Sequence, residues 1–204
     1  MKKIMFNDKY GLTGAVLKTS PTMTRRNIPE LDGIEDPNIS EWGIDDKGKA
    51  YVCLYVDGKP GIDIYPKYQP GEIVAIAQPY KDITDNKFFI NQCAANEETV
   101  SGMKYENGWN NKMFVASYYM PHQIEITDIK IERLQDISYE DCIREGVIKN
   151  GGWEPYNFAL RGFTEWFETP RNAFAALIDK VSGKGTWKQN PYVFVYSFKL
   201  IKPN

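Results

Sequence analysis

The sequence predicts an α+β fold with a closed or nearly closed β-barrel, built as one domain over residues 1–204. Strand-like segments outnumber helical ones, and they do not alternate with helices as they would in a doubly wound sheet. Aromatic residues make up 14% of the chain, which suits a β-rich core. With 204 residues, the chain can bury such a core without disulfide bonds.

The N-terminal part of the chain predicts short elements separated by turns. Residues 2–7 (KKIMFN) predict a strand, and residues 11–20 (GLTGAVLKTS) predict a short helix that Pro21 ends. Residues 50–68 predict a hairpin with its turn at DGKPG, and residues 71–78 a further strand.

Two stretches look different from the rest. Residues 27–49 are rich in Asp, Gly, Pro and Asn, and residues 81–112 are polar and end in the Gly- and Asn-rich sequence ENGWNNK. Such compositions are typical of loops, so we expect both stretches to be irregular and to lie outside the core.

The clearest strand begins at Ile124. Isoleucines alternate at positions 124 and 126, then resume out of phase at positions 129 and 131. Because successive side chains of a strand point to opposite faces, this slip predicts a β-bulge near Thr127 and Asp128.

Two helices have readable ends. Residues 138–146 begin with Ser138 as the N-cap and stop at a glycine, and residues 169–183 begin with Thr169 followed by a proline. The spacing in the second helix predicts a buried stripe of Phe174, Leu177, Ile178 and Val181. The last strand, residues 192–201 (YVFVYSFKLI), is apolar on both faces, which is typical of a central strand.

Composition excludes several classes of function. The net charge of −2 argues against a protein that coats nucleic acid, so any such contact must be local. A single histidine, His122, and cysteines without ligand spacing (Cys53, Cys93, Cys142) predict no metal site, and no glycine pattern predicts a cofactor. We expect the cysteines to be buried. We also expect the protein to be cytoplasmic, because no segment has the pattern of a signal peptide or a membrane span.

Residues 20–27 (SPTMTRRN) are the best candidate for a polar site. In an extended chain Thr22 and Thr24 share one face, whereas Arg25 and Arg26 point to opposite faces, so at most one arginine faces a cleft. An arginine beside a threonine hydroxyl suits a phosphate or carboxylate. The alternative is an exposed strand end whose arginine pairs with an acidic side chain.

Four stretches together resemble, in order, the blocks of ASCH-domain proteins, which are relatives of the PUA domain. They are IMFN…AVLKTSPTMTRRN, YQPGEIVAIAQ, ITDIKIERLQDISYEDCIREGV and SGKGTWKQNPYVFVYSFKLI. The sequence looks most similar to the long form found in bacteriophages and prophages, common in gut Bacteroidales, with residues 27–65 and 81–112 as insertions. The resemblance implies a PUA-like β-barrel whose flanking helices border a cleft, and RNA or modified nucleotides as partners.

Some small members of this family hydrolyse the acetyl amide of acetylated cytidine. They use a lysine, a nucleophilic threonine three residues later, and a glutamate in the short helix. Carried over to this chain, the threonine falls on Thr24 and the glutamate on Glu145, but the lysine falls on Pro21. Proline transfers no proton, and Lys18 replaces the missing amine only if the chain curls back.

The sequence leaves three functions open, and the resemblance implies the first two. In the preferred one, the domain binds RNA or a modified nucleotide without turnover, through Thr22, Thr24, Arg25, Arg26 and Glu145, with Trp187 and Asn190 near the rim. In the second, it hydrolyses an amide of a nucleoside such as N4-acetylcytidine, with Thr24 as nucleophile, Glu145 as proton shuttle and Lys18 as base. In the third, it is a phage accessory protein that binds a host protein. The first two require Thr24 and Glu145 to face one cleft.

Overall fold

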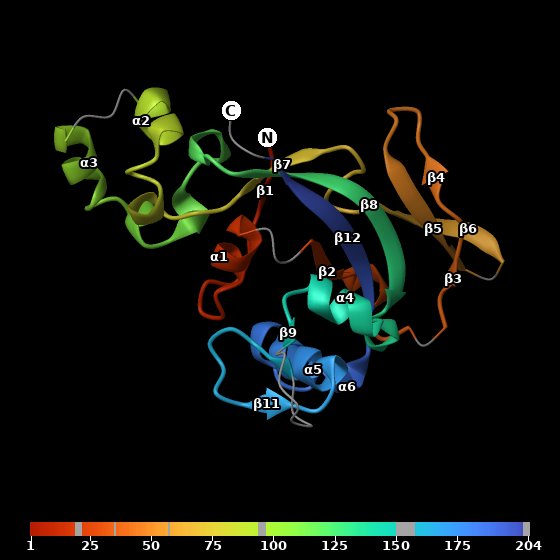
Figure 1. Ribbon diagram of the computed structural model, residues 1–204. Helices are drawn as coiled ribbons and strands as arrows, with labels where there is room; N and C mark the ends of the chain where they lie inside the picture. The colour runs from red at the N-terminus through yellow and green to blue at the C-terminus, as the bar shows by residue number, and fades with distance from the viewer. Residues whose placement is uncertain (19–21, 35, 57, 94–96, 150–157, 202–204) are drawn as a thin grey trace.

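The centre of the molecule is a five-stranded sheet in the order β1-β7-β8-β12-β2 (Figure 1). Its strands are β1 (Lys3–Ile4), β2 (Met23–Asn27), β7 (Ile73–Ile76), β8 (Gln123–Arg133) and β12 (Tyr192–Ile201). β1 is parallel to β7, and the other neighbours are antiparallel. The computed structural model describes residues 1–18, 22–34, 36–56, 58–93, 97–149 and 158–201.

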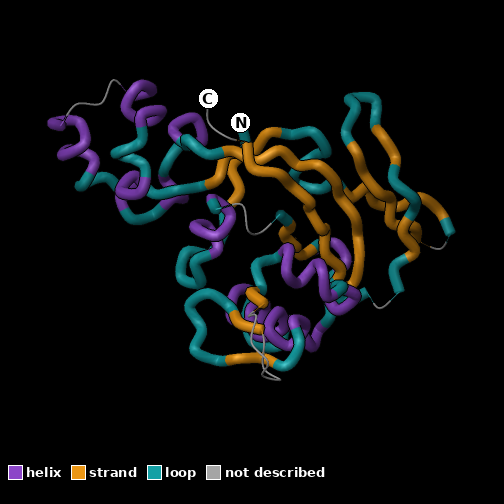
Figure 2. The backbone as a smooth tube through the Cα atoms, in the orientation of Figure 1, coloured by secondary structure: helices purple, strands orange, loops and turns teal. Residues whose placement is uncertain are grey.

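The sheet is open between its two end strands, β1 and β2. Over the described part of the chain these strands do not pair, so the structure confirms the α+β class but not a closed barrel. One side chain spans the opening, because the Nη2 of Arg26 on β2 donates a hydrogen bond to the carbonyl of Met5, the residue that follows β1, at 2.6 Å. In Figure 2 the strands run as a curved layer with helices and loops around this opening.

Helices cover one face of the sheet near β2. They are α4 (Tyr139–Arg144), α5 (Pro170–Val181) and α6 (Thr186–Gln189). A small sheet of β9 (Ile148–Lys149), β10 (Phe158–Ala159) and β11 (Trp166–Phe167) packs against α5. Ala173, Phe174 and Leu177 of α5 form a buried cluster with Val193 and Val195 of β12. Val181, predicted to belong to the same stripe, is instead 37% exposed, because α5 extends past the edge of this cluster.

The opposite face of the sheet is covered by residues 27–65, with α1 (Leu12–Leu17). This segment forms a 3₁₀ turn (Pro29–Leu31) and the strands β3 (Asn38–Ile39), β4 (Gly43–Ile44), β5 (Ala50–Val56) and β6 (Lys59–Ile64). The predicted hairpin is confirmed, but the expectation that residues 27–49 lie outside the core is wrong. Ile28 and Leu31 are buried in the same cluster as Phe194 and Tyr196. Polar residues and a proline surround Ile28 and Leu31 in the sequence, so no periodic pattern predicted that these two side chains are buried.

The described part of residues 81–112, which excludes 94–96, also contains more regular structure than its composition predicted. It includes α2 (Lys87–Cys93), α3 (Glu97–Met103) and the 3₁₀ turn Asn107–Trp109, and it overlaps the 3₁₀ turns Tyr80–Asp82 and Lys112–Phe114 at its two ends. Ile83 and Phe89 pack with Met120 in a separate buried cluster, and Figure 1 shows α2 and α3 at one end of the molecule. The helices are about two turns long, which is too short for their pattern to stand out from sequence.

The local signals in the other predicted elements are confirmed. Asp128 pairs with Ser197 and Ile126 pairs with Phe198, so Thr127 is the extra residue of a bulge. The Ser138 hydroxyl accepts a hydrogen bond from the Asp141 amide at 3.0 Å. The Thr169 hydroxyl accepts one in the same way at the start of α5, at 3.1 Å.

Gly108, in the 3₁₀ turn Asn107–Trp109, lies close to Tyr80 and Val115 of the buried cluster that contains Met120. A Cβ added there would lie 2.5 Å from Cε2 of Tyr80 and 3.0 Å from Val115. We therefore expect Gly108→Ala to lower the free energy of unfolding by about 1–3 kcal/mol, measured by urea denaturation. Gly102→Ala is the control, since a Cβ added in that helix meets nothing within 4 Å. An equal loss in both variants would contradict the tight packing at Gly108.

Candidate ligand-binding site

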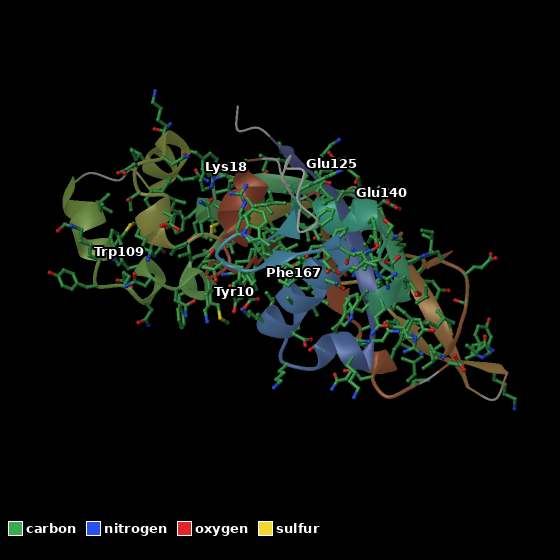
Figure 3. All side chains as sticks on the ribbon, turned by 60° about the horizontal axis from the view of Figure 1, so that its bottom comes forward. Tyr10, Lys18, Trp109, Glu125, Glu140 and Phe167 are labelled. Carbon is green, nitrogen blue, oxygen red and sulfur yellow. The ribbon has the colours of Figure 1, made fainter. Side chains whose placement is uncertain are left out.

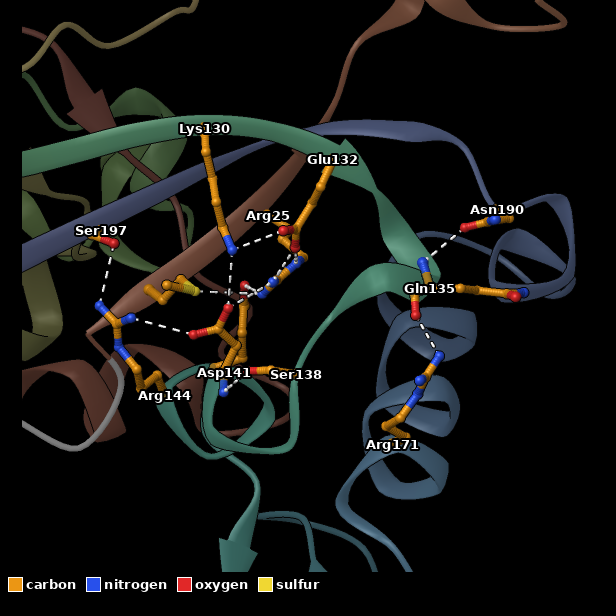
Figure 4. A network of polar contacts seen from close by, with 12 residues as sticks. Arg25, Lys130, Glu132, Gln135, Ser138, Asp141, Arg144, Arg171, Asn190 and Ser197 are labelled. Carbon is orange, nitrogen blue, oxygen red and sulfur yellow. Dashed lines mark hydrogen bonds and ion pairs between the residues drawn. The ribbon is translucent and has the colours of Figure 1, made fainter. Parts of the chain in front are cut away.

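Arg25 lies at the centre of a buried network of charges. β2 points it to the same side as Met23, toward the helices, and its side chain is only 1% exposed. Its guanidinium contacts three carboxylates from two elements. Two of them are labelled in Figure 4: Glu132 of β8, with Nε to Oε1 at 3.0 Å, and Asp141 of α4, with Nη2 to Oδ2 at 3.3 Å. The third is Glu145 at the C-cap of α4, with Nη1 to Oε1 at 2.8 Å.

Two further cations surround these carboxylates. Lys130 Nζ lies 2.7 Å from Glu132 Oε2 and 3.2 Å from Asp141 Oδ2, and Arg144 Nη1 lies 3.2 Å from Asp141 Oδ1. We call Arg25, Lys130, Glu132, Asp141, Arg144 and Glu145 the charge cluster. With three cations and three ionised carboxylates it is formally neutral. Arg25 therefore pairs with acidic side chains, as the alternative hypothesis for residues 20–27 predicted. It is buried, however, and does not lie at an exposed strand end.

The carboxyls of the charge cluster differ in acidity. Burial raises the pKa of Glu145 above its ordinary value, and the charge and hydrogen bond of Arg25 oppose this shift without cancelling it. Burial acts on Asp141 in the same direction, but there the hydrogen bond and charge of Lys130 outweigh it, so the pKa of Asp141 is lowered. Glu145 is thus the carboxyl of this pair that can exchange a proton nearer to neutral pH.

A pocket of about 240 Å³ occupies the opening between β1 and β2. We call it the gap pocket. Its walls are Met5, Phe6, Asn7 and Leu12 on the β1 side, Thr24, Arg25, Arg26 and Asn27 of β2, and Glu145, Phe174, Leu177, Ile178, Val181 and Ser182 on the helical side. Its charged groups therefore come from β2 and the end of α4, with Asn7 and Ser182 as further polar residues, and its apolar surface comes mainly from α5 and the segment after β1.

The gap pocket runs around the free edge of β2. Thr24 lies opposite Tyr196 on β12, and Arg26 stacks near Phe6, with 5.9 Å from its Cζ to the ring centre. Arg25 points the other way, with its Cζ 5.8 Å from the ring centre of Phe174. Thr24 and Glu145 consequently approach the pocket from opposite faces of β2 and both line it.

Other residues predicted for the site lie elsewhere. The Thr22 hydroxyl accepts a hydrogen bond from Nε of Arg144 at 3.3 Å, which ties the start of β2 to α4. Lys18 is exposed beyond the end of α1 and is not among the residues that line the gap pocket (Figure 3). Pro21, where the ASCH resemblance would place a lysine, lies outside the described residues.

Trp187 and Asn190, predicted near the rim, contact the protein interior and do not line the gap pocket. The Trp187 ring packs edge-on against Phe174, with 6.1 Å between ring centres. The side-chain oxygen of Asn190 accepts a hydrogen bond from the Gln135 amide at 2.7 Å, and the Trp187 carbonyl accepts one from the Gln135 side chain at 2.6 Å. Both residues join α6 to the segment after β8.

The sequence did not mark several residues of the site. Phe6 follows a two-residue strand and carries no pattern of its own. Glu132 and Asp141 lie in one of the stretches on which the proposed ASCH resemblance rests, yet nothing in their spacing shows that both carboxylates contact one arginine. Phe174 was predicted as core, and it is buried, but it also lines the pocket.

His122, Cys53 and Cys142 are not among the residues that line the gap pocket. Nδ1 of His122 lies 2.8 Å from Oε1 of Gln78, away from the gap pocket residues. Among the described residues no group of three or more His, Cys, Asp or Glu side chains could hold a metal ion. Cys53 and Cys142 are buried free thiols, as predicted. Within the described ranges, no helix is both long and apolar enough to cross a bilayer.

No family model, no curated protein and no solved structure matches this chain. The ligand of the gap pocket therefore cannot be inferred from a matching protein. Its size, its polar groups and its position between two open strand edges remain as the guide to what it binds.

Proposed function

We propose that this chain is a PUA-like domain of the ASCH type, of the long form found in bacteriophages and prophages, and that it binds a nucleobase of RNA or of a modified nucleotide in the gap pocket. The convergence of Thr24 and Glu145 on that pocket carries the proposal. The ASCH resemblance implies the same two residues from sequence alone. They come from β2 and from the end of α4, and both line one cavity.

The chemistry of the pocket suits an uncharged base better than a phosphate. Arg25 already has three carboxylate partners, and the charge cluster around it is formally neutral. The Thr24 hydroxyl can donate and accept a hydrogen bond, and a Glu145 carboxyl can accept one or, when protonated, donate one. The side chains of Ile178 and Val181, which are only partly buried, offer apolar contact to a planar group.

The second candidate is hydrolysis of an amide on a modified nucleoside. One observation favours it, since the raised pKa of Glu145 is what a proton shuttle near neutral pH needs. Two observations weigh against it. Lys18, the replacement base, does not line the pocket, and Glu145 is held in an ion pair with Arg25 at 2.8 Å. Binding without turnover therefore remains the preferred function.

A titration with cytidine, N4-acetylcytidine and short RNAs that carry either base tests the proposal. Calorimetry reports binding, and chromatography of the same samples reports loss of the acetyl group. We expect saturable binding without turnover. Turnover that disappears in Glu145→Gln would favour the hydrolase instead. If the folded protein gave neither signal, the proposed function would be wrong, and a protein partner would become the better hypothesis.

A further inference from the structure

A second hollow adjoins the gap pocket on the other side of Arg26. It has a volume of about 380 Å³ and we call it the aromatic pocket. It is lined by Met5, Arg26, Asn27, Ile28, Pro29, Glu30, Tyr65, Lys67, Tyr68, Phe194 and Tyr196, of which the first three also line the gap pocket. The two hollows therefore share the wall that Arg26 forms, and a chain-like ligand could pass from one to the other along it.

Arg26 differs from Arg25 in its partners. Its Nη2 donates to the Met5 carbonyl, but its Nε is buried and has no acceptor among the described residues. A buried donor without a partner carries a free-energy cost that a ligand oxygen would remove. The structure offers no carboxylate ion pair to Arg26 among its described residues, whereas Arg25 has three. Arg26 is thus the arginine of β2 that remains able to bind an anion.

The aromatic pocket offers one exposed ring to a base, that of Tyr65, whereas Phe194, Tyr68 and Tyr196 are buried behind it. Tyr68 and Tyr196 meet edge to face with 5.3 Å between ring centres, and Phe194 lies 6.1 Å from Tyr196, so these three rings form a fixed wall. Tyr65 at the mouth is 44% exposed. Bases stack on such rings largely irrespective of their sequence.

A third hollow continues from the mouth of the aromatic pocket. It has a volume of about 460 Å³ and we call it the lysine pocket. It shares Tyr65 and Lys67 with the aromatic pocket and is further lined by Lys2, Asp45, Lys47, Lys49, Pro66 and Gln69.

Positive charge is concentrated along these two hollows. Arg26, Lys2, Lys47, Lys49 and Lys67 line them, against the acids Glu30 and Asp45, although the whole chain has a net charge of −2. The carboxylate of Asp45 accepts hydrogen bonds from the backbone amides of Lys47 and Lys49, at 3.0 and 2.7 Å, and Lys2 pairs with Glu72 at 3.0 Å. A local excess of cations on an acidic protein is suited to a polyanion.

We propose that the aromatic and lysine pockets bind the phosphate-bearing nucleotides that flank the base in the gap pocket, so that the ligand is a single-stranded oligonucleotide and not a free nucleoside. This inference rests on the proposed function of the gap pocket. Arg26 binds the phosphate between the first two nucleotides, Tyr65 stacks with the second base, and Lys67, Lys47 and Lys49 follow the backbone. Most of these groups come from the inserted residues 27–65 and the turn after them.

Fluorescence anisotropy with labelled single-stranded RNA and DNA of about eight nucleotides, alongside calorimetry with the free nucleoside, tests this inference. We expect the oligonucleotide to bind at least about tenfold more tightly than the nucleoside. Lys67→Gln should weaken oligonucleotide binding about fivefold or more, lower its salt dependence, and leave nucleoside binding unchanged. The matched control is Lys104→Gln, which removes an exposed lysine that lines none of the three pockets.

The outcomes separate this inference from the proposed function. If the nucleoside binds, but the oligonucleotide binds no more tightly and Lys67→Gln has no effect beyond that of Lys104→Gln, the second site is wrong and the gap pocket stands. If the oligonucleotide binds through Lys67 while no nucleoside binds, the second site stands and the proposed role of the gap pocket is overturned. Equal affinity for RNA and DNA supports recognition through phosphates and rings, and a preference for RNA supports an added contact to the ribose hydroxyl.

Discussion

Replacing Arg25 with methionine is expected to lower the free energy of unfolding by about 3–5 kcal/mol. The substitution keeps an apolar side chain beside Phe174 but removes the charge that holds Glu132, Asp141 and Glu145 together. Lys130 still contacts two of these carboxylates, whereas Glu145 loses the one basic partner that the described ion pairs give it. Urea denaturation with matched slopes would measure the loss.

The control for this prediction is Arg144→Gln, which removes another cation of the charge cluster. Its side chain is 42% exposed, so water can replace its contact with Asp141, and the expected loss is at most about 1 kcal/mol. In the double variant Arg25→Met, Glu145→Leu, part of the stability should return because no unpaired carboxylate remains at that position. A loss below 1 kcal/mol for Arg25→Met alone would show that the cluster contributes little to the fold.

Val181→Trp is expected to weaken nucleoside binding at least about tenfold while leaving the fold intact. Val181 lines the gap pocket from the last turn of α5, and it is 37% exposed, so a larger side chain enters the pocket without displacing the core. Calorimetry with N4-acetylcytidine measures the affinity, and a thermal melt checks the fold. The melting temperature should change little, as for most substitutions outside the core.

Lys184→Trp is the matched control for the blocked pocket. It adds the same side chain three residues further along, at an exposed position that lines none of the gap, aromatic and lysine pockets. We expect it to bind the nucleoside like the unmodified protein. Loss of binding in both variants, or in neither, would mean that the nucleoside does not enter the gap pocket.

Local signals in the sequence were sufficient to predict most regular elements. The phase slip of isoleucines located the bulge at Thr127, and the hydroxyls of Ser138 and Thr169 marked helix starts, because each of these patterns reflects contacts within a few residues. The predictions for residues 27–49 and 81–112 were wrong because a local pattern cannot report contacts between residues that are distant in sequence. Their buried residues, such as Ile28 and Phe89, are stabilised by contacts that are distant in sequence and leave no local period.

The candidate site was only partly predictable. The resemblance to ASCH proteins singled out Thr24 and Glu145, and both line the gap pocket. No spacing rule could show that Arg25 would be neutralised by carboxylates from β8 and α4, or that Arg26 would be left without an ion pair in the described structure. The two arginines differ because their side chains point to opposite faces of β2, and the fold places the carboxylates on only one of these faces.

The most direct test of the central claim is an NMR titration that follows backbone amide signals as N4-acetylcytidine is added. If a nucleobase occupies the opening between β1 and β2, the largest shifts should fall on β2 around Thr24 and Arg26 and on α5 around Phe174, while α2 and α3 at the far end of the molecule remain unchanged. Shifts concentrated on α2 and α3, or a bound nucleoside that leaves the β2 amides unaffected, would contradict the account.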